Sequence, residues 1–201
     1  LMSLRNAALK SESVDLAYLD IIDQQLIEVS IPLIQKRHAF IQAIETKVQR
    51  LFQALTNDTH DISIEYQTLV SLDEDLQSAL ETKMQQTRSR DLAFKQSHVG
   101  VHRDDYTFMM NGQKVQDSAS QGQRRLLILA YKFALIEFFK ENKGVTPILC
   151  LDDLFSELDH QKRTTLFQFI PDDVQVFIST TDQAFIDPSI QGKVFVVHHG
   201  N

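Results

Sequence analysis

Length, composition and charge set the first limits on this chain. Its 201 residues with 43% apolar content allow one large or two small packed domains, and its net charge of −7 argues against DNA binding through an overall basic surface. A single cysteine excludes an internal disulfide and fits a reducing cytoplasm, and no apolar run approaches the roughly 20 residues of a membrane helix.

The first part of the chain predicts long amphipathic helices. Apolar residues recur at helical spacing over residues 14–56. Pro32 should bend this run or divide it, because proline lacks an N–H and crowds the preceding turn. Ser11 or Ser13 is the expected N-cap of the run.

A loop, a strand and another helix are expected next. Residues 57–61 have the composition of a loop. The alternation of Ile62, Ile64 and Tyr66 with polar residues predicts a half-buried strand. A helix is expected over residues 73–90, because acidic residues at its start and basic residues toward its end complement the helix dipole.

From about Phe94 onward, strands and helices alternate. Residues 106–110 predict a strand that leads into a type I′ turn at Asn111-Gly112, where both positions need a positive φ. Residues 121–141 predict a largely buried helix that ends at Gly144. Further expected elements are an apolar strand at 147–151, a helix at 159–169, and strands at 174–179 and 194–197. This order predicts an α/β fold with a mixed or parallel sheet covered by helices.

Two adjacent carboxylates, Asp152 and Asp153, follow the apolar strand. Ligands bind at the carboxyl ends of strands in α/β sheets. Hydrolysis of a nucleoside triphosphate needs a carboxylate that holds Mg²⁺ and a polar group that orients the attacking water. Adjacent side chains can divide these two roles. The alternative is that the pair forms a turn and a helix cap.

The segment Ser120-Gln121-Gly122-Gln123 stands at the head of the predicted buried helix. A hydroxyl and the N–H groups of a helix N-terminus form an anion site, and glycine lets a phosphate approach the backbone. The alternative is a capping box, in which Ser120 is the N-cap and Gln123 is the third helical residue.

These motifs occur in an order that resembles the C-terminal half of an ABC-type ATPase head. The order is a signature motif at 120–123, a Walker B strand ending at Asp152-Asp153, a D-loop at 156–159, and a switch strand before Thr181. The segments 100–105 and 119–124 narrow the resemblance to the RecF family, relatives of the SMC proteins. The resemblance covers nearly the whole chain and is specific between about Gly100 and Asp182.

The resemblance implies a role for each residue of the predicted site. Asp152 would bind Mg²⁺, and Asp153 would act as the catalytic residue that orients water. Asp153 stands where most ABC proteins have Glu, and its shorter reach suggests slow hydrolysis. The remaining roles would be contact with ATP held by the opposite subunit for Ser120, Gln121, Gly122 and Gln123, the D-loop for Ser156 and Asp159, and the switch position for Thr181.

The resemblance also implies an architecture and a function. Residues 1–92 would be part of a helical arm domain, and residues 93–201 would be the C-terminal lobe of the ATPase head. The parent protein would bind ATP and Mg²⁺, form an ATP-dependent homodimer, and clamp DNA at single-strand gaps or junctions. It would act in the cytoplasm, without a membrane partner, and together with RecO and RecR in recombinational repair, replication and the SOS response.

The pattern G-x-x-x-x-G-K-[ST] of a P-loop does not occur in this sequence, whereas RecF-like chains carry it near their N-terminus. We therefore expect the chain to be part of a longer protein, to hold half of an active site and to be inactive alone. The alternatives are another ABC-type machine, such as a transporter subunit or an SMC-type chromosome protein, and a non-catalytic interaction module. ATP-dependent DNA affinity would favour the RecF-like function over the interaction module.

Overall fold

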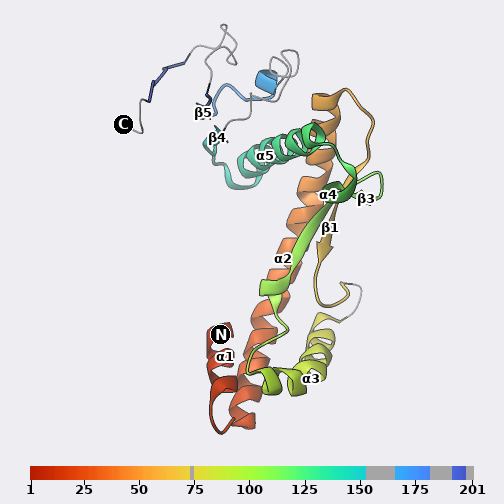
Figure 1. Ribbon diagram of the computed structural model, residues 1–201, viewed down its shortest axis with the longest axis vertical. Helices are drawn as coiled ribbons and strands as arrows, with labels where there is room; N and C mark the ends of the chain where they lie inside the picture. The colour runs from red at the N-terminus through yellow and green to blue at the C-terminus, as the bar shows by residue number, and fades with distance from the viewer. Residues whose placement is uncertain (73–74, 153–165, 182–191, 198–201) are drawn as a thin grey trace. The chain divides into compact units, whose positions relative to one another are not determined.

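The computed structural model describes residues 1–72, 75–152, 166–181 and 192–197 as a mixture of helices and small sheets (Figure 1). The chain forms two compact units. Unit 1 comprises Leu1–Glu45 and Ile62–Val115, and unit 2 comprises Thr46–Asp61 and Gln116–Asn201. The boundary between arm and head that the sequence predicts after residue 92 stays a prediction, and each unit is described by itself below.

The longest element is α2 (Leu16–Thr56), a helix of 41 residues that follows α1 (Met2–Lys10). Its first turn is capped by Asp15, whose carboxylate accepts a hydrogen bond of 3.1 Å from the N–H of Tyr18. The predicted caps Ser11 and Ser13 are therefore wrong. Ser11 instead ends α1, and its hydroxyl donates to the carbonyl oxygen of Ser13 at 3.0 Å.

Pro32 lies inside α2 without dividing it. The predicted division is wrong because the apolar face of the helix continues on both sides of the proline. Ile27 and Ile34 are both buried in the core of unit 1. Most helical stability in proteins comes from packing of such a face, so it outweighs the backbone hydrogen bond that proline removes.

Unit 1 contains a small antiparallel sheet. The strand β1 (Ile62–Gln67) pairs with β2 (Asp105–Met110), so that Ile62 lies opposite Met110 and Gln67 opposite Asp105 (Figure 1). The strand β3 (Gln113–Lys114) returns along β2. The turn between them has φ values of 51° at Asn111 and 75° at Gly112, which confirms the predicted positive φ at both positions.

The helix α3 (Leu76–Phe94) and the segment after it complete unit 1. Asp75 caps the helix by accepting hydrogen bonds from the N–H and the hydroxyl of Ser78. The helix ends at Phe94, beyond the predicted end at Arg90, and a 3₁₀ turn, η1 (Val101–Arg103), precedes β2. The apolar core of the unit includes Ile22, Leu26, Ile27, Ile34, Val70, Leu80, Met84 and Val99.

A fully buried arginine is also part of unit 1. Arg5 is 0% exposed, and its guanidinium lies 2.5 Å from Asp23 and 2.6 Å from Asp91. It also donates to the hydroxyl of Ser97 at 2.8 Å, and Asp91 accepts from both the N–H and the ring of His98. Burial opposes the charged form, but the hydrogen bonds with Asp23 and Asp91 outweigh it and raise the pKa of Arg5.

Unit 2 is built on α5 (Gln121–Lys143), which follows the short helix α4 (Val115–Ser118). Gly144 ends α5 in the left-handed conformation with φ of 61°, as predicted. The predicted burial on nearly all sides is wrong, because the apolar side chains of Ile128 and Phe139 are 56% and 39% exposed. Its buried residues are Leu126, Leu127, Leu129, Ala130, Phe133, Ala134 and Ile136.

Two parallel strands, β4 (Leu149–Asp152) and β5 (Val176–Ser179), belong to the same unit. Leu149 lies opposite Val176 and Asp152 opposite Ser179. This pair agrees with the predicted α/β fold with a parallel or mixed sheet, whereas β2 and β3 belong to a separate antiparallel sheet with β1. In β4 the side chains of Leu149 and Leu151 are buried, whereas those of Cys150 and Asp152 are exposed.

Two predicted elements near the end of the chain have different outcomes. The strand expected at 194–197 is wrong, because residues 192–197 have no regular structure and their apolar side chains are exposed. A strand forms only where a neighbouring backbone pairs with it. Of the helix expected at 159–169, residues 166–168 are helical, and residues 159–165 lie outside the described residues. None of the helices in the described ranges is long and apolar enough to span a bilayer.

Candidate functional site

Ser120 and Gln123 form a complete capping box at the start of α5. The hydroxyl oxygen of Ser120 accepts a hydrogen bond of 3.2 Å from the N–H of Gln123, and the side-chain oxygen of Gln123 accepts one of 2.9 Å from the N–H of Ser120. The structure therefore confirms the capping geometry. A capping serine still has its O–H proton to donate, so this geometry leaves Ser120 able to contact a phosphate oxygen.

The first turn of α5 is open to solvent at the predicted signature motif. Ser120, Gln121 and Gly122 are exposed. A side chain placed at Gly122 would meet no atom within 4 Å, and Gly122 does not have a positive φ. Neither packing nor backbone conformation therefore requires glycine here. The opening suits the approach of an anion to the N–H groups of the first turn, which have no partners within the helix.

Asp152 lies at the carboxyl end of β4, where the sequence places the Mg²⁺ ligand. Its side chain is exposed and accepts a hydrogen bond from the hydroxyl of Ser179, the residue opposite it at the end of β5. Thr181, the predicted switch residue, follows β5 and is also exposed. The sequence analysis missed Ser179 because its place beside Asp152 depends on the pairing register of two strands.

The donor set around Asp152 fits a magnesium ion. Mg²⁺ prefers oxygen ligands and usually keeps several waters, so one exposed carboxylate with an adjacent hydroxyl is a suitable protein contribution. Within the described residues, no group of three or more His, Cys, Asp and Glu side chains is arranged to hold a metal ion. The other predicted residues of this region, Asp153, Ser156 and Asp159, lie outside the described residues.

Next to the signature motif lies a histidine that the sequence analysis did not select. His60 lies in the loop after α2, and its ring Nε2 is 3.1 Å from the side-chain nitrogen of Gln123. The same ring nitrogen is 2.9 Å from a carboxylate oxygen of Asp58. The residues His60 and Gln123 are 63 positions apart, so no local pattern in the sequence indicates this contact.

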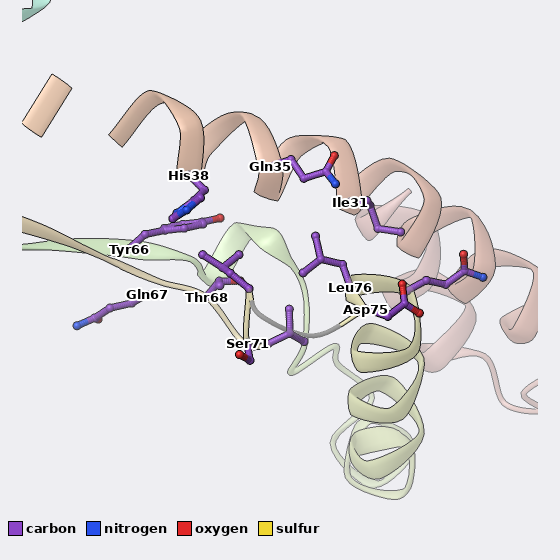
Figure 2. Close-up of a pocket in the computed structure, with 12 residues that line it drawn as sticks. Ile31, Gln35, His38, Tyr66, Gln67, Thr68, Ser71, Asp75 and Leu76 are labelled. Atoms are coloured by element: carbon purple, nitrogen blue, oxygen red, sulfur yellow. The ribbon is translucent and has the colours of Figure 1, made fainter. Parts of the chain in front are cut away.

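A cavity of about 990 Å³ lies in unit 1. His38 of α2 and Tyr66 of β1 lie at one end, and Asp75 and Leu76 at the start of α3 lie at the other (Figure 2). The lining is mostly neutral and combines several amide and hydroxyl groups with aliphatic side chains. It contains none of the residues that the sequence assigns to ATP or Mg²⁺. The lining residues are Ile31, Gln35, His38, Tyr66, Gln67, Thr68, Val70, Ser71, Leu72, Asp75, Leu76 and Gln77.

Tyr66 connects this cavity to a buried carboxylate. Its hydroxyl donates to Asp104 at 2.6 Å, and Arg37 lies 3.1 Å from the same carboxylate oxygen. The side chain of Asp104 is only 2% exposed. Burial and the hydrogen bond to Asp104 raise the pKa of Tyr66 to about 12. These three side chains form a structural network that connects α2, β1 and the start of β2.

No family model matches the chain. Curated proteins do match it. The DNA replication and repair protein RecF of Streptococcus suis (strain 05ZYH33) is 41% identical over 180 residues, which are 88% of this chain and 49% of that protein. RecF of Listeria welshimeri is 35% identical over 210 residues, which cover 100% of this chain and 57% of that protein. The chain is a homologue of RecF.

Solved structures agree with this assignment. A structure described as the recombination mediator protein RecF-ATP in the RecFOR pathway superposes with a TM-score of 0.78 at 26% identity, over 90% of this chain and 50% of that one. A second RecF structure, with ATPrS, gives a TM-score of 0.79 over 92% of this chain and 52% of that one. The mixture of helices and small sheets is therefore the RecF-type ABC ATPase fold. The chain spans about half the length of the curated relatives that it matches.

Proposed function

We propose that this chain is part of a cytoplasmic, ATP-dependent RecF protein that acts in recombinational DNA repair. Its similarity to RecF proteins of two genera and to a RecF-ATP structure supports this function. The observation that carries the proposal is the exposed carboxylate of Asp152 at the end of a parallel strand, bonded to the hydroxyl of Ser179. The carboxyl end of parallel strands is where α/β proteins bind their ligands.

In this proposal the end of β4 is the magnesium side of an ATP site. Asp152 would hold Mg²⁺ through the water shell of the ion, and the hydroxyl of Ser179 would fix the orientation of its carboxylate. Asp153 orients the attacking water, and Thr181 contacts the γ-phosphate. The metal neutralises charge that develops during phosphoryl transfer.

The start of α5 is the contact to a second ATP, held by the partner subunit. The hydroxyl of Ser120 donates a hydrogen bond to the γ-phosphate, and the N–H groups of Gln121 and Gly122 face the same anion. ATP then joins two heads, with Ser156 and Asp159 along the interface. The ATP-bound dimer clamps DNA at single-strand gaps or junctions and acts with RecO and RecR, in replication and the SOS response as well as repair.

A chimaera tests this function, with the matching residues of Streptococcus suis RecF replaced by this chain. By the family pattern, the rest of the relative would supply the P-loop that this sequence lacks. We expect ATP to increase both dimerisation, measured by sedimentation, and affinity for gapped DNA. Partner or DNA binding that is the same with and without ATP would instead support a non-catalytic interaction module.

The two adjacent aspartates should behave differently in the chimaera. Asp152→Asn removes the metal ligand, so Mg²⁺-dependent ATP binding should weaken. Asp153→Asn leaves the metal ligand in place but orients water poorly, so the protein should retain ATP and stay dimeric. Nucleotide binding and dimer lifetime are the measurements. Normal dimerisation and hydrolysis in both variants would show that the assignment is wrong.

Ser120→Asp separates phosphate contact from capping. Serine and aspartate both cap helices well, and aspartate also complements the helix dipole, so a purely structural Ser120 tolerates the change. If Ser120 meets a γ-phosphate, the new carboxylate repels it. ATP-driven dimerisation of the chimaera should then be lost while its melting temperature stays within a few degrees. A variant that dimerises normally on ATP would leave capping as the only role of Ser120.

A further inference from the structure

His60 is held in place by the last turns of α2. The chain reverses at Asn57, which has a φ of 54°, and then returns along the helix. The carbonyl oxygen of His60 accepts hydrogen bonds from the side-chain amides of Gln49 at 3.0 Å and Gln53 at 3.4 Å. The ring of Phe52 lies 6.4 Å from the His60 ring, and the His60 side chain is 24% exposed. The position of the ring is therefore well defined.

The hydrogen bonds of Gln123 determine which atom faces this ring. A backbone N–H needs an acceptor, and in a glutamine side chain only the oxygen accepts, so the Gln123 oxygen must face Ser120, to which it bonds at 2.9 Å. The NH₂ of Gln123 then points at Nε2 of His60, 3.1 Å away. Because an amide NH₂ only donates, Nε2 must accept. This contact requires a neutral His60 with its proton on Nδ1.

A hydrogen bond with Asp58 requires the opposite state of the same nitrogen, with a proton on Nε2. The carboxylate oxygen of Asp58 lies 2.9 Å from Nε2 and can only accept a hydrogen bond. With a proton, Nε2 donates to Asp58 and repels the NH₂ of Gln123. Without a proton, Nε2 accepts from Gln123 and repels the carboxylate of Asp58. The side chains Gln49, Gln53 and Phe52 of α2, which also contact His60, are neutral.

We propose that His60 is a positioning residue for the signature motif, and that its Nε2 holds Gln123, and through it Ser120, in the geometry of the capping box. When Nε2 carries a proton, it donates to Asp58 and no longer accepts from Gln123, so the side chain of Gln123 is released. The effect of this contact on ATP rests on the proposed function above. Its effect on the geometry of the motif does not.

The first test measures the tautomer of His60 and the stability of the capping box in the whole 201-residue chain, without nucleotide. NMR of His60 should show a neutral ring with its proton on Nδ1. His60→Leu removes the acceptor that holds the Gln123 side chain, so hydrogen exchange at the backbone N–H of Ser120, from which that side chain accepts a hydrogen bond, should rise roughly fivefold, as for loss of one hydrogen bond. His60→Gln keeps an oxygen acceptor and should restore protection. His102→Leu replaces an exposed histidine of η1 and serves as the matched control.

A proton on Nε2 in the neutral ring, or unchanged exchange at the backbone N–H of Ser120 in His60→Leu, would overturn the proposal.

The chimaera then tests the connection to ATP. His60→Leu should weaken ATP-driven dimerisation, and His60→Gln should restore it. If the wild-type chimaera dimerises on ATP and His60→Leu is equal to it, the connection to ATP is wrong while the proposed function stands. If the wild-type chimaera does not respond to ATP, the proposed function is wrong, and the NMR result still decides whether His60 positions the motif.

Discussion

The two units of this chain use charged groups in different ways. In unit 1, Arg5 is fully buried between Asp23 and Asp91, and every partner of its guanidinium belongs to a fixed network. In unit 2, ion pairs such as Arg50 with Glu137 lie at the surface, with Arg50 58% exposed. Asp152 and Ser120 are also exposed. The Arg5 network of unit 1 is closed to solvent, whereas unit 2 presents polar groups that a ligand can reach.

The largest expected effect comes from removing the buried cation of unit 1. Arg5→Met leaves the carboxylates of Asp23 and Asp91 buried without their counter-charge, so the free energy of unfolding should fall by about 3–5 kcal/mol. Urea denaturation followed by circular dichroism measures this change. A loss below about 1 kcal/mol would show that the Arg5 network resembles the surface pairs of unit 2.

A smaller effect is expected from the second buried network of unit 1. Tyr66→Phe removes the hydroxyl that donates to Asp104, so the free energy of unfolding should fall by about 1.5–3 kcal/mol, as for a hydrogen bond to a charged group.

The same hydrogen bond predicts an alkaline transition. Because the folded pKa of Tyr66 is raised to about 12, its contribution to stability is complete below the ordinary tyrosine pKa near 10. The contribution is lost as the pH rises from there through about 12. Denaturation of wild type and Tyr66→Phe between pH 9 and about 12 should therefore converge, whereas a constant difference between them would contradict the assignment.

In unit 2, the matched change Arg50→Met should have little effect. The pair with Glu137 is solvated, so the free energy of unfolding should change by about 0.2–1 kcal/mol and the difference should shrink in high salt. The same urea titration measures it beside Arg5→Met. A loss as large as that of Arg5→Met would remove the contrast between the two units.

The smallest effect is expected at Asp173, which pairs with Lys140 at 2.6 Å on the surface of unit 2. The hydrogen bond from Lys140 lowers the pKa of Asp173, so the stability that it adds is present above the ordinary carboxylate pKa and is lost as the pH falls through the folded value. NMR titration should show this low pKa, and Lys140→Met should raise it. An unchanged pKa in Lys140→Met would assign the shift to another group, such as Thr146, which also donates to this carboxylate.

Features encoded within a few residues were predictable from the sequence. The turn at Asn111-Gly112, the cap at Gly144 and the box formed by Ser120 and Gln123 each depend on local hydrogen bonds or on glycine's access to positive φ. The carboxyl end of β4 was predictable as well, because the apolar run before Asp152 is shorter than a typical helix and begins after Pro147.

Features that depend on distant residues were not predictable. Arg5 bonds to Asp23 and Asp91, which are 18 and 86 positions away in the sequence. Nothing near Arg5 in the sequence distinguishes it from a solvated arginine. The continuation of α2 through Pro32 depends on packing against the rest of unit 1. Residues 194–197 have the composition of a strand. A strand forms only when another strand pairs with it, and local composition does not determine that pairing.

The path of α2 has a practical consequence for dividing the protein. The chain passes from unit 1 to unit 2 between Glu45 and Thr46, in the middle of a helix about 60 Å long, and it passes back at Ile62. Ile44 and Val48, one turn apart on either side of this point, are both fully buried. A truncation here would create a frayed, apolar helix end rather than cut a linker. Domain-mapping proteases should therefore spare residues 44–48 and cut first in exposed loops.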